Sequence, residues 1–323
     1  MKAQHAAVQL IDHYPEASNF MEEVLKGLNK KQKQLSPKFL YDQRGSELFE
    51  KITTLPEYYV TRTEISILKQ YALEMADVVG EEAVLVEYGS GSSTKIKLLL
   101  DHLPNLSAYM PIDISKEFLK QSAEALAREY HALKIIAICA DYTSAFNLPE
   151  IGSHSKKVAF FPGSTIGNFD PLYAQKFLRK IAKMLQTGDG LLIGVDLKKD
   201  RQTLHDAYND KQGITAAFNL NMLTRINNEL GANFEFNQFQ HKAFYNEEFG
   251  RIEMHIQSLV DQEVAIGENS FSFKRNETIH TENSYKYTIH EFQTMAKESG
   301  FKPVEVWTDQ NEWFSVHYLT VNG

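Results

Sequence analysis

Residues 84–94, which read VLVEYGSGSST, constrain the fold of this chain more than any other stretch. A short apolar run leads into a Gly-x-Gly turn from Gly89 to Gly91, and a helix-like pattern follows over residues 95–100. Glycines let the backbone turn tightly and come close to a ligand, and the start of the helix offers unpaired N–H groups. The arrangement is typical of a parallel strand that leads into a helix beneath a nucleotide-like ligand, and a plain strand-to-helix turn is the alternative.

The turn differs from the dinucleotide-binding fingerprint, because Thr94 occupies the place of its third glycine. An acid, Glu87, stands two residues before the first glycine and suits a ligand that carries a cation. Both features favour S-adenosylmethionine, whose methionine part has an ammonium and a sulfonium, over NAD. We therefore expect this cofactor to contact Glu87, Gly89, Ser90 and Gly91.

The next apolar segment, residues 108–113, ends in Asp113, 24 positions after Gly89. An acid at the tip of the second strand can accept hydrogen bonds from both hydroxyls of a ribose. The alternative role for Asp113 is an N-cap for a helix over residues 115–128.

A third apolar segment, residues 134–139, is followed by Asp141 and Tyr142. In such a sheet a carboxylate at this place can meet an adenine amino group, and an aromatic ring can cover the base. The alternative is a loop aspartate beside a packed tyrosine.

Composition limits the kinds of partner that the chain can have. The 323 residues are 43% hydrophobic and 24% charged, with a formal net charge of −8, which is the balance of a globular protein. The one short basic run, residues 30–33, is predicted to be a solvated surface segment, so we expect no nucleic-acid partner. We expect a monomer that acts on a small molecule.

The single cysteine, Cys139, lies in an apolar segment, which predicts an inert, buried thiol in a reducing compartment, the cytoplasm. Residues 1–15 lack the apolar core of a signal peptide, and no apolar run reaches the length of a membrane span. We therefore expect no membrane association.

Strands and helices alternate between residues 83 and 198, which predicts a doubly wound α/β sheet. Near-continuous apolar runs over residues 157–161 and 190–196 predict buried parallel strands. Between them, Asp170 and Pro171 are a typical helix start.

After residue 199 the pattern changes to two helices and then, from residue 238 to 282, to alternating strands and turns. A capping box at residues 288–291 predicts a helix that stops at Gly300, and two closing strands follow over residues 304–307 and 314–320. A helix followed by an antiparallel pair is how class I methyltransferase sheets commonly end.

These patterns predict a class I Rossmann-like S-adenosylmethionine methyltransferase sheet, residues 61–199 and 285–323. A second, smaller α+β substrate-binding domain or lid is expected over residues 1–60 and 200–284. Residues 1–35 are expected to be helical, and residues 61–64, which read TRTE, resemble a capping box that opens a helix over residues 65–76.

Two segments carry side chains that suit an acceptor molecule. Residues 162–168 offer small residues, backbone carbonyls that can hold an amine, and the amide of Asn168. A turn that caps the following helix is the alternative.

Glu282 and Ser284 are two residues apart in an extended segment, so their side chains face the same side. A carboxylate that accepts and a hydroxyl that both donates and accepts match an imidazole, which has one N–H and one bare nitrogen. An exposed strand edge is the alternative.

Tyr58 and Tyr208 are candidate phenol donors for a carboxylate, although an apolar anchor also explains Tyr208. The eleven histidines show no metal-ligand spacing, so we expect no metal.

Several motifs together resemble the histidine-specific Nα-methyltransferases of ergothioneine biosynthesis. They are LPEYY at 55–59, the EYGSGS turn at 87–92, GSTIGN at 163–168, GITAAFN at 213–219, RIEM at 251–254 and WTD at 307–309. The resemblance covers the chain from about residue 36 to its end. It implies transfer of three methyl groups from S-adenosylmethionine to the α-amino group of L-histidine, which gives hercynine.

The resemblance also implies roles for particular residues. Those expected to hold the cofactor are Gly89, Lys95, Asp113 and Asp141. Those expected to hold the carboxylate and the amine are Tyr58, Asn168 and Tyr208, with carbonyls from Gly163 and Thr165. Those expected to surround the imidazole are Glu282 and Ser284, with Tyr41 and Met254. Tyr88, where many relatives carry leucine, is a departure that should alter packing more than chemistry.

Two other functions remain open. The same machinery could act on another amino acid or amine, such as a tryptophan derivative, and the Glu-x-Ser pair is what should separate histidine from those substrates. A non-catalytic S-adenosylmethionine sensor is the third reading, and a decayed enzyme would be expected to lose Asn168 or Tyr58.

Overall fold

The computed structural model describes residues 8–13, 18–91, 93–144, 146–151 and 155–323. Contacts within the chain divide it into two compact units. Unit 1 contains Met1–Tyr14, Val60–Lys198 and Lys286–Gly323, and unit 2 contains Pro15–Tyr59 and Lys199–Tyr285. The chain therefore leaves and re-enters unit 1 twice.

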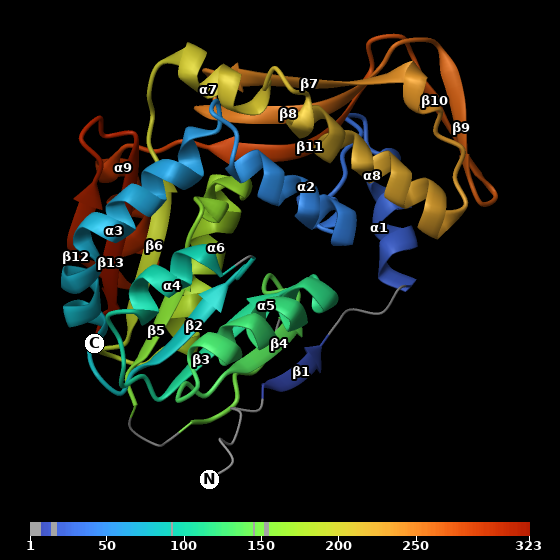
Figure 1. Ribbon diagram of the computed structural model, residues 1–323. Helices are drawn as coiled ribbons and strands as arrows, with labels where there is room; N and C mark the ends of the chain where they lie inside the picture. Colours follow the sequence, from blue (N-terminus) through green and yellow to red (C-terminus); the bar gives the residue numbers. More distant parts are fainter. Residues whose placement is uncertain (1–7, 14–17, 92, 145, 152–154) are drawn as a thin grey trace. The chain divides into compact units, whose positions relative to one another are not determined.

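Unit 1 is built on an eight-stranded sheet with the order β1-β4-β3-β2-β5-β6-β13-β12 (Figure 1). Its strands are β1 (Gln9–His13), β2 (Val84–Tyr88), β3 (Ala108–Asp113), β4 (Ile136–Ala140), β5 (Lys157–Phe161), β6 (Gly190–Asp196), β12 (Phe301–Thr308) and β13 (Phe314–Val321). Strands β1 to β6 pair in parallel, and β13 is antiparallel to both of its neighbours. The order reverses between β2 and β5, which is the switch point of a doubly wound fold.

Helices cover both faces of this sheet. They are α3 (Tyr59–Val79), α4 (Thr94–Leu100), α5 (Lys116–Glu129), α6 (Pro171–Met184) and α9 (Ile289–Glu298). Right-handed crossovers put α4 and α5 on one face and α6 on the other, where α9 packs beside it. Two predicted helix starts are confirmed: Asp170 accepts a hydrogen bond from the Tyr173 N–H, and Thr288 and Glu291 form a capping box.

Unit 2 combines helices with small antiparallel sheets. Its elements are α1 (Ser18–Leu28), η1 (Pro37–Leu40), α2 (Gln43–Thr53), α7 (Arg201–Tyr208), α8 (Ile214–Leu230), η3 (Phe236–Gln238), β7 (Phe239–Asn246), β8 (Arg251–Ser258), β9 (Gln262–Ile266), β10 (Asn269–Phe273) and β11 (Thr278–Tyr285). The larger sheet has the order β11-β8-β7, and β9 pairs with β10 (Figure 1). Helix α8 packs against α2 and against β7 and β8. The predicted antiparallel strands between residues 238 and 282 are confirmed.

The N-terminal segment differs from the prediction. Residues 9–13, expected to be helical, form strand β1, which pairs in parallel with β4. They therefore group with unit 1, whereas the predicted second domain began at residue 1. Strand β1 is mostly exposed and lies at the sheet edge, so its conformation is fixed by pairing with β4 more than by a buried face. Residues 1–7 and 14–17 of the predicted helical segment lie outside the described residues.

The predicted capping box at residues 61–64 is also wrong. Helix α3 begins at Tyr59, so all four residues lie inside it, and it continues to Val79 through a kink at Tyr71. A capping box requires its first residue to stand before the first helical turn. Glu64 uses its carboxylate in a different way, described below.

Cys139 lies in β4 and is buried, as predicted. Burial raises the pKa of its thiol to about 12, so the reactive thiolate is disfavoured. Among the described residues, no helix is both long and apolar enough to cross a lipid bilayer.

Candidate functional site

The glycine turn follows β2 at the carboxyl edge of the sheet in unit 1. Gly89 and Gly91 both have positive φ, +72° and +50°, which other residues adopt only with strain. The hydroxyl of Ser90 is buried and has no hydrogen-bond partner among the described residues. A buried polar group without a partner is costly, so the turn fits a polar ligand that would satisfy it. Ser92 of the same motif lies outside the described residues.

Asp113 ends β3 beside this turn. One of its carboxylate oxygens accepts a hydrogen bond from the Ser115 N–H at 2.9 Å, and the other lies 3.3 Å from the Gly91 nitrogen. The carboxylate therefore steadies the start of α5 and also the glycine turn. Its place at the strand tip fits the ribose-binding role. The N-cap of α5 is Ser115 and not Asp113, so the capping role that was the alternative is not found.

Asp141 and Tyr142 follow β4. Asp141 accepts hydrogen bonds from the backbone N–H and the hydroxyl of Thr143. The Tyr142 ring lies near the turn, since a Cβ placed on Gly89 would be 3.9 Å from it, and it packs against Tyr88 with 6.0 Å between ring centroids. The structure thus brings Tyr142 to the glycine turn, and both residues stay predicted cofactor contacts.

Glu87 lies in β2 and is almost fully buried. The hydroxyl of Tyr109 donates a hydrogen bond to its carboxylate. Burial raises the pKa of Glu87 to about 8, although this hydrogen bond and the Lys95 ammonium both act to lower it. A buried acid next to the turn is well suited to a cationic ligand, as the sequence suggested, because a nearby positive charge favours its ionised form.

We predict that this burial makes the stability of the protein fall as pH rises. The unfolded chain releases the Glu87 proton near pH 4.5, whereas the folded state keeps it to about pH 8. Between these values the folded state binds more protons, so Glu87 lowers the free energy of unfolding by about 1 kcal/mol per pH unit. Glu87→Gln removes this effect, so its melting temperature should exceed that of the wild type by a margin that grows from pH 5 to pH 8. Glu81→Gln, at an exposed loop position, is the control, and a margin independent of pH would contradict the prediction.

Glu64 was not predicted as a site residue. It projects from the N-terminal part of α3, is fully buried, and accepts a hydrogen bond from the Gly163 N–H, which lies 2.9 Å from both of its oxygens. Its carboxylate also lies 2.6 Å from Lys95 Nζ, the predicted cofactor ligand. Glu64 therefore ties the loop after β5 to the helix after the glycine turn.

A second buried ion pair holds the same loop. Lys286 Nζ lies 2.6 Å from the Asp196 carboxylate at the end of β6, and both side chains are fully buried. The Asp196 N–H donates a hydrogen bond to the Ser164 hydroxyl at 2.9 Å. Gly163 and Ser164 both have positive φ, so the loop has a conformation that needs such support.

The loop ends in a short 3₁₀ helix, η2 (Thr165–Asn168). The Thr165 hydroxyl donates to the Pro162 carbonyl at 3.0 Å. The N-cap of α6 comes from the side chain of Asp170, so Asn168 is not needed for the capping role that was its alternative. Gly163, Thr165 and Asn168 stay predicted contacts of the acceptor amine.

The predicted substrate residues of unit 2 gather in an aromatic cluster. The Tyr41 ring packs edge-on against Phe49 and Phe218, with centroids 5.6 and 5.5 Å apart. Phe49 in turn contacts Tyr58 at 6.4 Å, and Tyr58 contacts Tyr208 at 6.1 Å. These contacts bring three tyrosines from different elements together. Tyr41 follows η1, Tyr58 precedes α3, and Tyr208 ends α7.

Tyr208 connects this cluster to strand β11. Its hydroxyl donates a hydrogen bond to Ser284 Oγ at 2.8 Å. Glu282 pairs across the sheet with Met254, and Ser284 pairs with Ile252, so these side chains share one face. Glu282 and Ser284 are nine-tenths or more buried, which disagrees with the exposed strand edge that was their alternative.

The opposite face of this sheet carries Glu253, His255 and His280, whose ligand-type atoms lie within 4.8 Å of one another. The two imidazole rings are stacked at 4.6 Å with an angle of 12° between their planes. Lone pairs in stacked rings run nearly parallel, so they do not converge on one ion, and Glu253 already contacts Arg251 and His255. The expectation of no metal stays a prediction.

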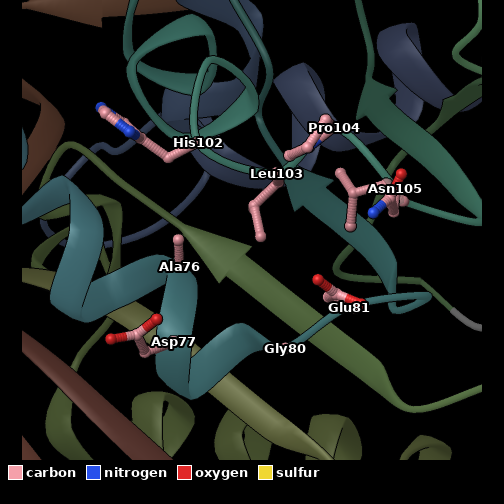
Figure 2. A pocket seen from close by; sticks show the side chains of 9 residues that line it. Ala76, Asp77, Gly80, Glu81, His102, Leu103, Pro104 and Asn105 are labelled. Atoms are coloured by element: carbon pink, nitrogen blue, oxygen red, sulfur yellow. The ribbon is translucent and has the colours of Figure 1, made fainter.

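Unit 1 has a surface hollow of about 280 Å³. Figure 2 shows the side chains that line it. It lies before β2 and β3, at the amino ends of these strands, and its lining includes exposed side chains such as Asp77, Glu81 and His102. Ligands of doubly wound sheets bind at the carboxyl ends of the strands. The hollow is therefore separate from the predicted cofactor site.

A doubly wound sheet with an antiparallel end, a glycine turn after β2 and an acid at the tip of β3 is the architecture typical of class I S-adenosylmethionine-dependent methyltransferases. Residues 20–321 match the family described as histidine-specific methyltransferase, SAM-dependent. The chain belongs to this family, and it is an N-methyltransferase that uses S-adenosylmethionine.

Two relatives agree with this assignment in sequence. A histidine N-alpha-methyltransferase of Mycobacterium tuberculosis is 40% identical over 89% of this chain and 90% of its own. Ergothioneine biosynthesis protein 1 of Neurospora crassa is 34% identical over 89% of this chain, which corresponds to 33% of that longer protein. A solved S-adenosylmethionine-dependent methyltransferase from Clostridium acetobutylicum is 10% identical, with a TM-score of 0.48, and the match covers 80% of this chain and 92% of that one.

Proposed function

We propose that the protein trimethylates the α-amino group of L-histidine, with S-adenosylmethionine as the methyl donor, and so makes hercynine for ergothioneine biosynthesis. One observation carries the choice of histidine within the family. Glu282 and Ser284 share a buried face of β11, and the Tyr208 hydroxyl donates to Ser284 at 2.8 Å.

This pair suits a neutral imidazole, which has one N–H and one bare nitrogen. The Glu282 carboxylate would accept a hydrogen bond from the N–H. Ser284 would donate to the bare nitrogen, and the hydrogen bond that it accepts from Tyr208 strengthens its hydroxyl as a donor. The aromatic cluster with Tyr41 and Tyr58 would supply the walls and a phenol for the carboxylate.

In unit 1 the residues fit the cofactor, since the turn has a buried acid, Glu87, and a buried Ser90 hydroxyl that no other described residue binds. When bound, S-adenosylmethionine supplies the methyl group as an electrophile on its sulfonium. The residues that would hold it are Gly89 and Lys95, Asp113 at the tip of β3, and Asp141 and Tyr142 after β4.

The loop residues Gly163, Thr165 and Asn168 would hold the amine and orient its lone pair, and this positioning is the main contribution to the rate. The amine must be neutral to attack, so the site must favour the loss of its proton. After three transfers the nitrogen has no lone pair, and the reaction ends without a special signal.

The decisive test is mass spectrometry of a reaction that contains the protein, S-adenosylmethionine and L-histidine, with tryptophan and tyrosine as parallel acceptors. Trimethylated histidine alone supports the proposal. Methylation of another acceptor in place of histidine would leave the fold and cofactor intact and overturn the assignment of Glu282 and Ser284. No methylation of any acceptor would favour the sensor, and a melting temperature that rises with S-adenosylmethionine but not with histidine would support that reading.

Removal of the Glu282 carboxylate should weaken the use of histidine. In Glu282→Ala the imidazole N–H loses its acceptor, at a cost of about 1–3 kcal/mol. This corresponds to a fall in kcat/KM for histidine of about fivefold to 150-fold. Glu263→Ala, at an exposed position of β9, is the matched control and should keep the wild-type value. An unchanged kcat/KM in Glu282→Ala would show that Glu282 does not bind the imidazole of the substrate.

The proposal also covers the cellular compartment and the oligomeric state of the enzyme. We place it in the cytoplasm, because a chain with one cysteine can form no disulfide within itself. We propose that it is a monomer that acts on a small molecule. Size-exclusion chromatography with light scattering tests the oligomeric state.

A further inference from the structure

Strand β11 contains a β-bulge directly before the Glu282–Ser284 pair. His280 pairs with His255 and Glu282 pairs with Met254, so Thr281 is an extra residue opposite a continuous stretch of β8. With strict alternation Glu282 would point to the same face as His280. The bulge instead puts Glu282 on the face of Met254, which is the face where Ser284 meets Tyr208.

The hydroxyl of Thr281 holds this bulge in place. Thr281 is buried, and its Oγ1 lies 2.6 Å from Asn219 Oδ1 and 3.0 Å from the Met254 carbonyl oxygen. The hydroxyl has one hydrogen, which these two acceptors share, so the extra residue is tied to helix α8 and to the neighbouring strand.

Asn219 is the centre of a wider buried network. Its side chain is fully buried, and its amide nitrogen lies 2.9 Å from the His255 carbonyl oxygen and 2.9 Å from His241 Nδ1. The amide has two hydrogens, one for each acceptor, while its oxygen accepts from Thr281. One side chain therefore connects α8 to all three strands of the sheet.

His241 extends the network to Tyr208. Its Nε2 lies 2.9 Å from the Tyr208 carbonyl oxygen, so Nε2 carries the hydrogen and Nδ1 is the acceptor for Asn219. Burial lowers the pKa of His241, which keeps this neutral form. The network thus reaches the backbone of the residue whose hydroxyl binds Ser284.

We infer that Thr281 and Asn219 are positioning residues for the substrate: they hold the bulge that turns Glu282 and Ser284 toward the histidine imidazole. Neither side chain is assigned to the substrate itself. The inference rests on the proposed function, because it gives this network the task of aiming the imidazole-binding pair.

The test compares Thr281→Val, which has nearly the same shape without the hydroxyl, with Thr281→Ser, which keeps it. Thr278→Val is the matched control, because Thr278 lies on the same strand and its hydroxyl bonds to His255 Nδ1 at 3.1 Å on the other face of the sheet. For each variant one measures KM and kcat for L-histidine, the Kd of S-adenosylmethionine by calorimetry, and the melting temperature.

We expect Thr281→Val to raise KM for histidine at least about tenfold, with little change in the cofactor Kd. Thr281→Ser should restore most of the wild-type KM, and Thr278→Val should lose stability without a change in KM. A KM in Thr281→Val within about twofold of the wild type would overturn the inference, as would an equal rise in Thr278→Val.

The two proposals fail in different ways. If the wild type does not methylate histidine, the proposed function fails whatever the variants do. If the wild type is active and only the variant comparison fails, the positioning role alone is lost. If Thr281→Val does not fold, Asn219→Ser provides the second variant, since it removes the acceptor of the Thr281 hydroxyl, and the same rise in KM is required.

Discussion

Replacement of Lys286 by methionine is expected to lower the free energy of unfolding of unit 1 by about 3–5 kcal/mol. The change removes the ammonium that lies 2.6 Å from the Asp196 carboxylate and leaves that charge in a fully buried place. Both tryptophans of the chain, Trp307 and Trp313, lie in unit 1, so their fluorescence during urea unfolding reports on this unit.

Two further variants separate the effect of the buried charge from that of the lysine side chain. Lys198→Met removes an exposed ion pair with Glu291, and it should cost less than about 1 kcal/mol. The double variant Lys286→Met with Asp196→Asn has no unpaired charge and should recover much of the loss. A loss in Lys286→Met no larger than that in Lys198→Met would contradict the assignment of the pair as buried.

The second large effect is expected at Glu64. In Glu64→Ala the Gly163 N–H and the Lys95 ammonium lose their shared acceptor, at a cost of about 3 kcal/mol in unfolding free energy. Because this loop and Lys95 are predicted to contact the amine and the cofactor, kcat should also fall at least about tenfold. Glu64→Gln keeps an acceptor without the charge, so its loss should be intermediate.

The matched control for this change is Glu74→Ala on the same helix. Glu74 is exposed and accepts one hydrogen bond from the Trp307 indole, so its replacement should leave kcat unchanged. Urea unfolding followed by circular dichroism avoids any direct effect on the tryptophan signal. A Glu64→Ala enzyme with the stability and kcat of Glu74→Ala would show that Glu64 does not support the loop.

Elements with a strong local signal were predictable from the sequence. Strands β5 and β6 match their predicted ranges because buried parallel strands read as unbroken apolar runs. Strand β1 was not predictable, since it is a five-residue, mostly exposed edge strand whose partner, β4, comes more than 120 residues later. The sequence of residues 9–13 alone does not indicate this pairing, because strand formation depends on the neighbouring strand.

Some residues of the candidate site were likewise predictable from the local sequence, and others were not. The glycine turn and the strand-tip acids could be found because each follows an apolar run at a fixed place. Glu64 could not, because TRTE matches a capping box locally while the carboxylate is used by Gly163, 99 residues away. Alternation placed Glu282 and Ser284 on one side of β11, but only the bulge at Thr281 decides which side that is.

The position of β13 has a consequence for synthesis of the protein. This strand lies between β6 and β12, and it follows every other strand of the sheet in the chain. While the ribosome is still making the residues before Phe314, the outer edge of the fully buried strand β6 has no backbone partner in the sheet. An open apolar strand edge is a site for pairing between nascent chains. Unit 2, whose last residue is Tyr285, is complete before that edge is closed.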